Sequence, residues 1–168
     1  DEAETARQAF DEAFAVVPDE RMLFQNKARD VLAVAEQMVL GEIAFKAGRR
    51  EEGLAYLREA VSRDDNLMYE EPWSWPQPPR HALGALLMEA GEYEEAEAVY
   101  RADLGLDGKL PRPSQHPRNV WALHGLHECL TRRGETVERM HIKGLLDQAV
   151  ARADIAIRAS CLCRAVAA

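Results

Sequence analysis

Residues 83–100 form the stretch that most constrains how this chain can fold. Apolar residues recur every three or four positions on both sides of Gly91, which is typical of two short amphipathic helices joined by a turn. Gly84 and Ala96 are small and stand where the two helices would touch, so the helix backbones can approach closely. The stretch therefore predicts a helical hairpin, with helices over about residues 80–90 and 92–104.

The same kind of pattern predicts two more hairpins, over about residues 30–62 and 119–156. The first is broken at Gly48 and the last at Gly134, and apolar residues recur at helical spacing on both sides of each break. The helices expected in these two hairpins span about residues 22–47, 51–62, 119–132 and 136–156.

Three glycines relate the hairpins to one another. Gly41, Gly84 and Gly125 take the same place in the three first helices and are spaced 43 and 41 residues apart. A further helix over residues 3–16 precedes them, and Pro18 ends it because proline disfavours helix in the residue before it. The chain is therefore expected to repeat one helical unit after a leading helix.

The repeated unit resembles the tetratricopeptide repeat (TPR), a helical hairpin of about 34 residues with a set pattern of Trp, Leu, Gly, Ala and aromatic positions. The residues that match this pattern are Leu40, Gly41, Leu57 and Ala60 in the first copy, Leu83, Gly84, Ala96 and Tyr100 in the second, and Trp121 and Gly125 in the third. Gln37 and Arg80 replace the Trp, Asp103 replaces an Ala, and long loops widen the spacing. The resemblance covers about residues 30–156. It implies an all-α, right-handed α-solenoid of about three TPR-like helical hairpins plus a leading helix, in a single domain over residues 1–168.

A proline-rich loop over residues 63–79 separates the first two hairpins and carries Tyr69, Trp73 and Trp75. Its prolines exclude a helix interior, and its paired tryptophans predict that the loop is anchored. Two interpretations stay open. As a structural element, which we favour, the loop packs across the first two hairpins. As a functional element, it presents an exposed aromatic recognition surface.

The chain also resembles the C-terminal part of longer multi-repeat TPR proteins. This likeness rests on the loop before Pro79-Arg80, on Leu83-Gly84 and on an Ala-rich helix that ends near Ala153-Asp154. A helical pattern that begins at Asp1, with no initiator methionine, agrees with a piece of a longer protein. The tail over residues 157–168 is expected to be partly helical or frayed.

The composition narrows the classes of partner and compartment. The 21 basic and 29 acidic residues give a net charge of −8, and such a surface repels phosphate backbones, so we expect no nucleic-acid partner. No run approaches the roughly 20 apolar residues of a membrane helix, so we expect no membrane insertion. With no signal segment in the sequence, a soluble, cytoplasmic protein is favoured. Three cysteines are too few for a disulfide framework and are compatible with a reducing compartment.

The candidate binding site is the inner groove of the repeats. By the resemblance, first-helix positions that flank each Leu-Gly pair face this groove, which is mixed in character, fairly apolar and suited to a helix or an extended peptide. These positions are Met38, Glu42, Phe45, Lys46, His81, Ala85, Met88, Glu89, Ala122, Leu126, Cys129 and Leu130. The alternative is that Met38, Phe45 and Met88 belong to the core of a short solenoid.

A metal site or a redox pair is the alternative chemistry. His124 and His127 can share a helix face, and Cys161 and Cys163 could supply thiolates for zinc. The spacing is C-x-C instead of the usual C-x2-C, and His124 occupies a packing position of the repeat, so we expect no metal and no other cofactor.

We expect no catalytic activity. The clusters Glu92-Glu94-Glu95-Glu97 and Glu70-Glu71 are predicted to be solvated surface, and the sequence contains no Ser/His/Asp order, P-loop or G-x-G-x-x-G motif. The prediction is a non-catalytic scaffold or adaptor that binds a protein or peptide. A metal- or redox-responsive module and an accessory domain of an enzyme complex remain as alternatives.

Overall fold

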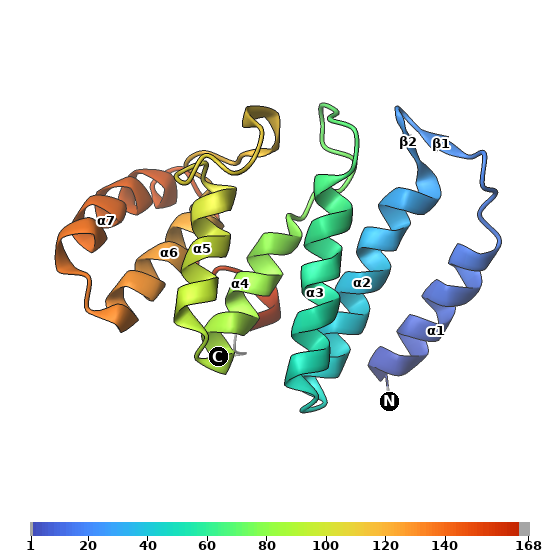
Figure 1. Cartoon of the computed structure of the whole chain (residues 1–168), viewed down its shortest axis with the longest axis horizontal. Helices are drawn as coiled ribbons and strands as arrows, with labels where there is room; N and C mark the ends of the chain where they lie inside the picture. The colour runs from blue at the N-terminus through green and yellow to red at the C-terminus, as the bar shows by residue number, and fades with distance from the viewer. Residues whose placement is uncertain (1, 165–168) are drawn as a thin grey trace. The chain divides into compact units, whose positions relative to one another are not determined.

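The structure is a computed structural model that describes residues 2–164. The chain divides into two compact units, Asp1–Pro79 (unit 1) and Arg80–Ala168 (unit 2), and each is described by itself. The regular secondary structure of the described residues is helical apart from one small β-hairpin, which confirms the predicted all-α class (Figure 1). Within these residues, no helix is both long enough and apolar enough to cross a membrane. One domain over residues 1–168 stays a prediction.

Unit 1 is centred on two helices that pack side by side, α2 (Ala28–Lys46) and α3 (Arg50–Asp65) (Figure 1). Only the turn around Gly48, at a φ of +87°, joins them, so they run in opposite directions. Their backbones meet where Gly41 faces Gly53. A Cβ atom on Gly53 would lie 2.7 Å from the Gly41 carbonyl oxygen, so this crossing depends on the missing side chain.

The helix predicted from Met22 begins only at Ala28, and the residues before it form a β-hairpin, β1 (Met22–Leu23) and β2 (Asn26–Lys27). The buried side chain of Asn26 explains the difference. Its Nδ2 donates to the Met68 carbonyl and to Ser74 Oγ, both at 2.9 Å, and its Oδ1 accepts from the Met68 N–H at 2.7 Å. These bonds reach residues more than forty positions away, and helical periodicity contains no sign of them.

The leading helix α1 (Glu2–Ala15) ends shortly before Pro18, as predicted, and none of its residues is buried. Arg29 of α2 attaches it to unit 1. The Arg29 guanidinium donates from Nη1 to the carbonyls of Phe14 and Val17 and lies 4.8 Å from the centroid of the Phe14 ring.

Unit 2 begins with α4 (Pro79–Ala90) and α5 (Tyr93–Asp103), which turn at Gly91 as predicted. After a loop with the short 3₁₀ helix η1 (Arg112–Ser114) come α6 (Val120–Arg133) and α7 (Thr136–Val150). Asn119 caps α6, because its Oδ1 accepts from the backbone N–H groups of Trp121 and Ala122.

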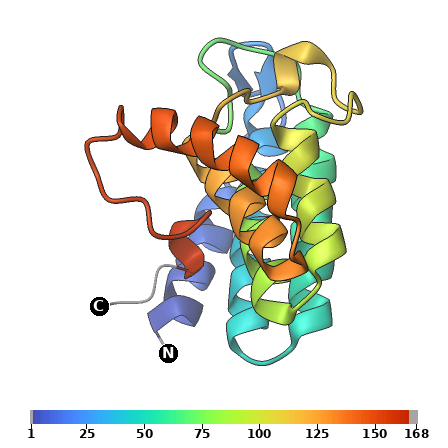
Figure 2. The same ribbon diagram turned by 90° about the vertical axis from the view of Figure 1, so that its left-hand side faces the viewer.

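The last predicted helix is shorter than expected, because α7 ends at Val150 instead of Ala156. The chain then leaves the helix and returns through an irregular stretch to the 3₁₀ helix η2 (Leu162–Arg164) (Figure 2). Ala159, Ser160 and Cys161 are buried in this return. A continued helix would carry them elsewhere, so their burial is the physical reason for the early end. Residues 165–168 of the predicted tail lie outside the described residues.

Candidate functional site

Most of the predicted groove positions are buried. In unit 1, Met38 and Phe45 are buried and Lys46 is exposed. Glu42 is half-buried, and burial raises the pKa of its carboxyl above the ordinary value although Lys46 opposes the shift. The apolar members of the predicted site in unit 1 are therefore covered, as in the core alternative.

The same holds in unit 2. The predicted groove positions buried there are His81, Ala85, Met88, Ala122, Leu126, Cys129 and Leu130, whereas Glu89 is exposed. Cys129 Sγ lies 2.9 Å from Met88 Sδ, and burial raises the pKa of the Cys129 thiol to about 12. That thiol is therefore a packing group and stays protonated at neutral pH.

The loop over residues 63–79 is attached to α2 of unit 1 and leaves part of its aromatic surface exposed. Trp75 is half-buried, and its Nε1 donates to Met38 Sδ at 3.1 Å, which anchors the loop to α2. Ser74 is held by Asn26 and also donates to Glu70. Trp73 is 45% exposed and Tyr69 44% exposed. Within unit 1 the middle of the loop is thus structural, while two of its aromatic rings face outward.

The predicted metal ligands do not come together. Within residues 2–164, no three His, Cys, Asp or Glu side chains are placed to share a metal ion. Cys161 and Cys163 pair with each other as a disulfide. His124 Nδ1 and His127 Nε2 are buried without a hydrogen-bond partner, and burial lowers the pKa of both imidazoles, which keeps them neutral.

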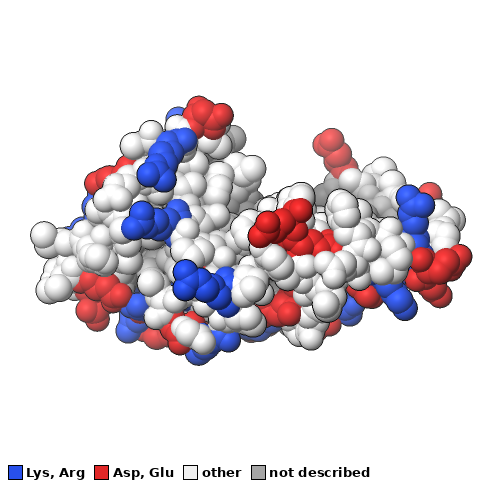
Figure 3. All heavy atoms as spheres, turned by 90° about the horizontal axis from the view of Figure 1, so that it is seen from above, with Lys and Arg blue, Asp and Glu red and all other residues white. Residues whose placement is uncertain are grey.

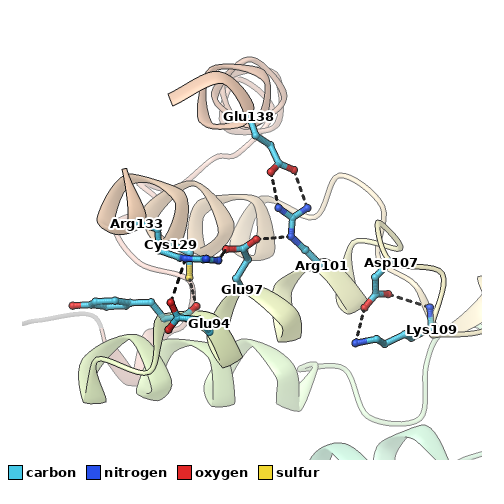
Figure 4. A network of polar contacts seen from close by, with 9 residues as sticks. Glu94, Glu97, Arg101, Asp107, Lys109, Cys129, Arg133 and Glu138 are labelled. Carbon is cyan, nitrogen blue, oxygen red and sulfur yellow. Dashed lines mark hydrogen bonds and ion pairs between the residues drawn. The ribbon is translucent and has the colours of Figure 1, made fainter. Parts of the chain in front are cut away.

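The acidic cluster on α5 is more than solvated surface, which corrects the prediction for Glu97. Its buried carboxylate accepts from Arg101 Nε at 2.7 Å and pairs with Arg133 of α6 (Figure 4). The other end of the Arg101 guanidinium forms two parallel bonds to Glu138 of α7, at 2.8 and 2.6 Å. These ion pairs join α5, α6 and α7.

Glu70 was also expected at the surface, and that prediction is wrong because its side chain is buried. Its carboxylate accepts from the Gln25 N–H and from the Ser74 hydroxyl. Burial alone would raise the pKa of Glu70, but these hydrogen bonds hold it below its ordinary value. Glu70 therefore connects the β-hairpin to the loop that follows α3.

A buried cluster in unit 2 was missed by the sequence analysis. Asp103, which has no exposed surface, accepts from His81 Nε2 at 3.0 Å and from His116 Nδ1 at 2.8 Å. Burial would raise the pKa of Asp103, but the bonds from His116 and His81 together hold it below its ordinary value. The cluster connects the loop over residues 104–119 to α4 and α5. The one sign of this cluster in the sequence is Asp103 itself, a charged residue at a position where the TPR pattern has Ala.

In unit 2, Tyr100 of α5 is the centre of a surface that holds another part of the chain. Its fully buried ring lies between two helix backbones, those of α4 at Gly84 and of α6 at Gly125. A Cβ atom on either glycine would lie within 2.5 Å of the ring. The two glycines therefore fix the direction of the ring, and the Tyr100 hydroxyl reaches Ser160 Oγ at 2.5 Å.

Residues 159–164, here called the docked segment, lie against this part of unit 2 (Figure 2). Ser160 at one end meets Tyr100. Arg164 at the other end forms two bonds to the Glu128 carboxylate of α6, at 2.6 and 2.8 Å. Burial would raise the pKa of Glu128, but Arg164 holds it below its ordinary value, so the carboxylate is charged. Unit 2 thus holds a short stretch of polypeptide, which ends in the 3₁₀ helix η2, through one hydroxyl and one carboxylate.

Both basic and acidic side chains reach the surface on the face drawn in Figure 3.

In comparisons with known proteins, no family model, curated protein or solved structure matches this chain.

Proposed function

We propose that the chain is a non-catalytic binding module, made of TPR-like hairpins in a right-handed solenoid, that holds a protein or peptide partner as a scaffold or adaptor. The repeating glycines support this architecture. Gly41 faces a neighbouring helix backbone in unit 1, and Gly84 and Gly125 face the Tyr100 ring in unit 2. Helical hairpins that pack closely need small residues at such crossings.

The observation that carries the binding function is the docked segment. Unit 2 holds residues 159–164 by contacts that another peptide with suitable side chains in a similar turn can make: a hydrogen bond at Tyr100 and an ion pair at Glu128. A tyrosine fixed by two helix backbones and a charged carboxylate on the next helix form a prepared recognition surface.

The polar side chains support a role without catalysis. Glu70, Glu97 and Asp103 each bind neighbouring side chains that hold the fold together. A catalytic carboxyl needs access to a substrate, and these three are buried.

Selection of peptides on the full-length chain tests the proposal. A displayed library of random peptides, both linear and closed into short turns, is selected on the immobilised protein, with and without a phosphine reductant. The chain with Glu128→Gln and the chain with Glu135→Gln, an exposed carboxylate on the turn before α7, serve as matched variants. We expect selected peptides whose affinity falls about tenfold with Glu128→Gln and is unchanged with Glu135→Gln. A library that yields no peptide dependent on Glu128 would contradict the proposal.

A further inference from the structure

We propose that the docked segment is an internal occupant of a peptide-binding surface on unit 2, and that the Cys161–Cys163 disulfide controls whether it stays there. The partner that displaces it is a peptide with a small hydroxyl residue and, four positions later, an arginine, held in a closed turn like the one between Ser160 and Arg164. This inference rests on the binding function proposed above and adds the class of partner and its control.

The receiving surface does not depend on the docked segment for its shape. Gly84 and Gly125 fix the Tyr100 ring from both sides. Burial raises the pKa of the Tyr100 hydroxyl, so the group stays neutral and available as donor or acceptor. Glu128 belongs to the middle of α6, an element whose position is set by its packing on α5 and α7. Both recognition groups therefore stand on helices and are ready for an incoming ligand.

The docked segment is held in a way that allows its release. Its buried side chains are small, since Ala159, Ser160 and Cys161 bury little apolar surface, whereas Leu162 is 69% exposed. Its attachment therefore depends mainly on the two polar contacts of Ser160 and Arg164. An external peptide that makes the same two contacts competes on equal terms, apart from the advantage of covalent attachment to the chain.

The disulfide lies between these two contacts. It joins Cys161 to Cys163 across the exposed Leu162, with Cα atoms 5.3 Å apart. The same turn carries a hydrogen bond from the Arg164 N–H to the Cys161 carbonyl, at 3.2 Å. A closed turn holds Ser160 and Arg164 at one spacing, so both can reach their partners together. When the turn is open, the contact of Ser160 with Tyr100 and that of Arg164 with Glu128 form independently. Each contact must then offset the conformational entropy that the chain loses when it forms.

The chemistry is a thiol–disulfide exchange with a cellular dithiol of the thioredoxin class. Cys163 is half-exposed, so a thiolate of the dithiol can attack its sulfur; the bond to Cys161 breaks, and Cys161 leaves as a thiolate that takes up a proton. The second thiol of the reductant then attacks the mixed disulfide and releases Cys163. Two electrons pass from the dithiol, which becomes a disulfide, to the chain, which now carries two thiols. Transfer in the opposite direction restores the docked state.

The test measures peptide binding by the full-length chain in its two redox states. The probe is a fluorescent peptide with the sequence of residues 157–164 in which a thioether replaces the disulfide, so its turn stays closed in the presence of the phosphine. Fluorescence anisotropy gives its dissociation constant for the oxidised chain and for the chain reduced with a phosphine. We expect affinity to rise about tenfold or more on reduction, because the internal occupant is released. A chain with Cys163→Ser should bind like the reduced chain and be insensitive to the phosphine.

A second variant separates the control mechanism from the binding function. The chain with Ser160→Ala and Arg164→Ala lacks both docking contacts in either redox state. If it binds the probe tightly while reduction of the parent chain has no effect, the disulfide control is wrong and the binding function stands. If neither this variant nor the reduced chain binds the probe, both proposals fall. A reduced chain that dimerises and takes up no probe would assign the surface to a second copy instead.

Discussion

Replacing Gly125 by alanine tests whether the Tyr100 ring is clamped between two helices. The added Cβ would lie 2.2 Å from Tyr100 Cζ, whereas ordinary Cβ contacts begin near 3.4 Å. The ring has little room to move aside, because Gly84 also lies against it, at a place where an added Cβ would be 2.5 Å from Tyr100 Cζ. The helices must therefore separate or the ring must leave its place.

The expected magnitude follows from two opposing effects. Overpacking a well-packed core costs typically about 1–3 kcal/mol, and a clamp on both sides favours the upper end of that range. Alanine also gains about 1 kcal/mol over glycine in a helix interior. We expect a net loss of about 2 kcal/mol in the free energy of unfolding.

The matched control is Gly144→Ala in α7. No atom lies within 4 Å of the Cβ that this substitution adds, so only the gain of about 0.5–1 kcal/mol in helix propensity is expected. Urea unfolding followed by circular dichroism measures both variants, and their stabilities should differ by roughly 3 kcal/mol. Equal stability of the two variants would contradict the clamp.

A double-substitution cycle gives a second check on the same contact. Adding Tyr100→Leu to the Gly125→Ala chain removes the ring atoms that the new Cβ meets. The two substitutions should then cost at least about 1 kcal/mol less together than the sum of their separate costs. Simple additivity would mean that the loss at Gly125 has another origin.

Three other substitutions examine the polar contacts. With Asp103→Asn, the parent chain should be more stable by about 1–3 kcal/mol at pH 7. The folded pKa of Asp103 lies below its ordinary value, so this difference in stability is complete above about pH 4 and is lost as the pH falls further. Urea unfolding of both chains from pH 7 to pH 3 measures the difference. A difference that does not change with pH would contradict the role of the Asp103 cluster. Asn119→Ala should cost about 1 kcal/mol through loss of the α6 cap, and an unchanged urea midpoint would contradict the cap. Asn26→Ala should speed amide hydrogen exchange in residues 22–27 and 66–75 while α3 stays protected; unchanged exchange would show that Asn26 does not hold the hairpin.

Local sequence signals predicted most of the helices. The periodicity on both sides of Gly91 located α4 and α5 to within a residue or two, and Pro18 correctly marked the end of the leading helix. Such signals work because helix formation and termination depend on residues within a few positions of one another.

Long-range polar contacts account for what the sequence analysis missed. Asn26 draws the chain before α2 into a β-hairpin through partners 42 and 48 residues away. The turn of the chain after Val150 depends on Ser160, whose partner Tyr100 is 60 residues away. The order of residues along the chain gives no sign of such pairs.

For the candidate site, too, some features follow from the sequence and others only from the tertiary structure. The sequence by itself determined an all-helical chain with glycines at regular crossings, because helix propensity and side-chain size are properties of each residue in its local context. Only the tertiary structure decided that the expected groove positions are mostly covered, that Asp103 is buried between two histidines, and that Tyr100 and Glu128 hold residues 159–164. The physical reason is that the burial and pairing of a polar group depend on which distant segments fold against it, and that is a property of the whole packed unit.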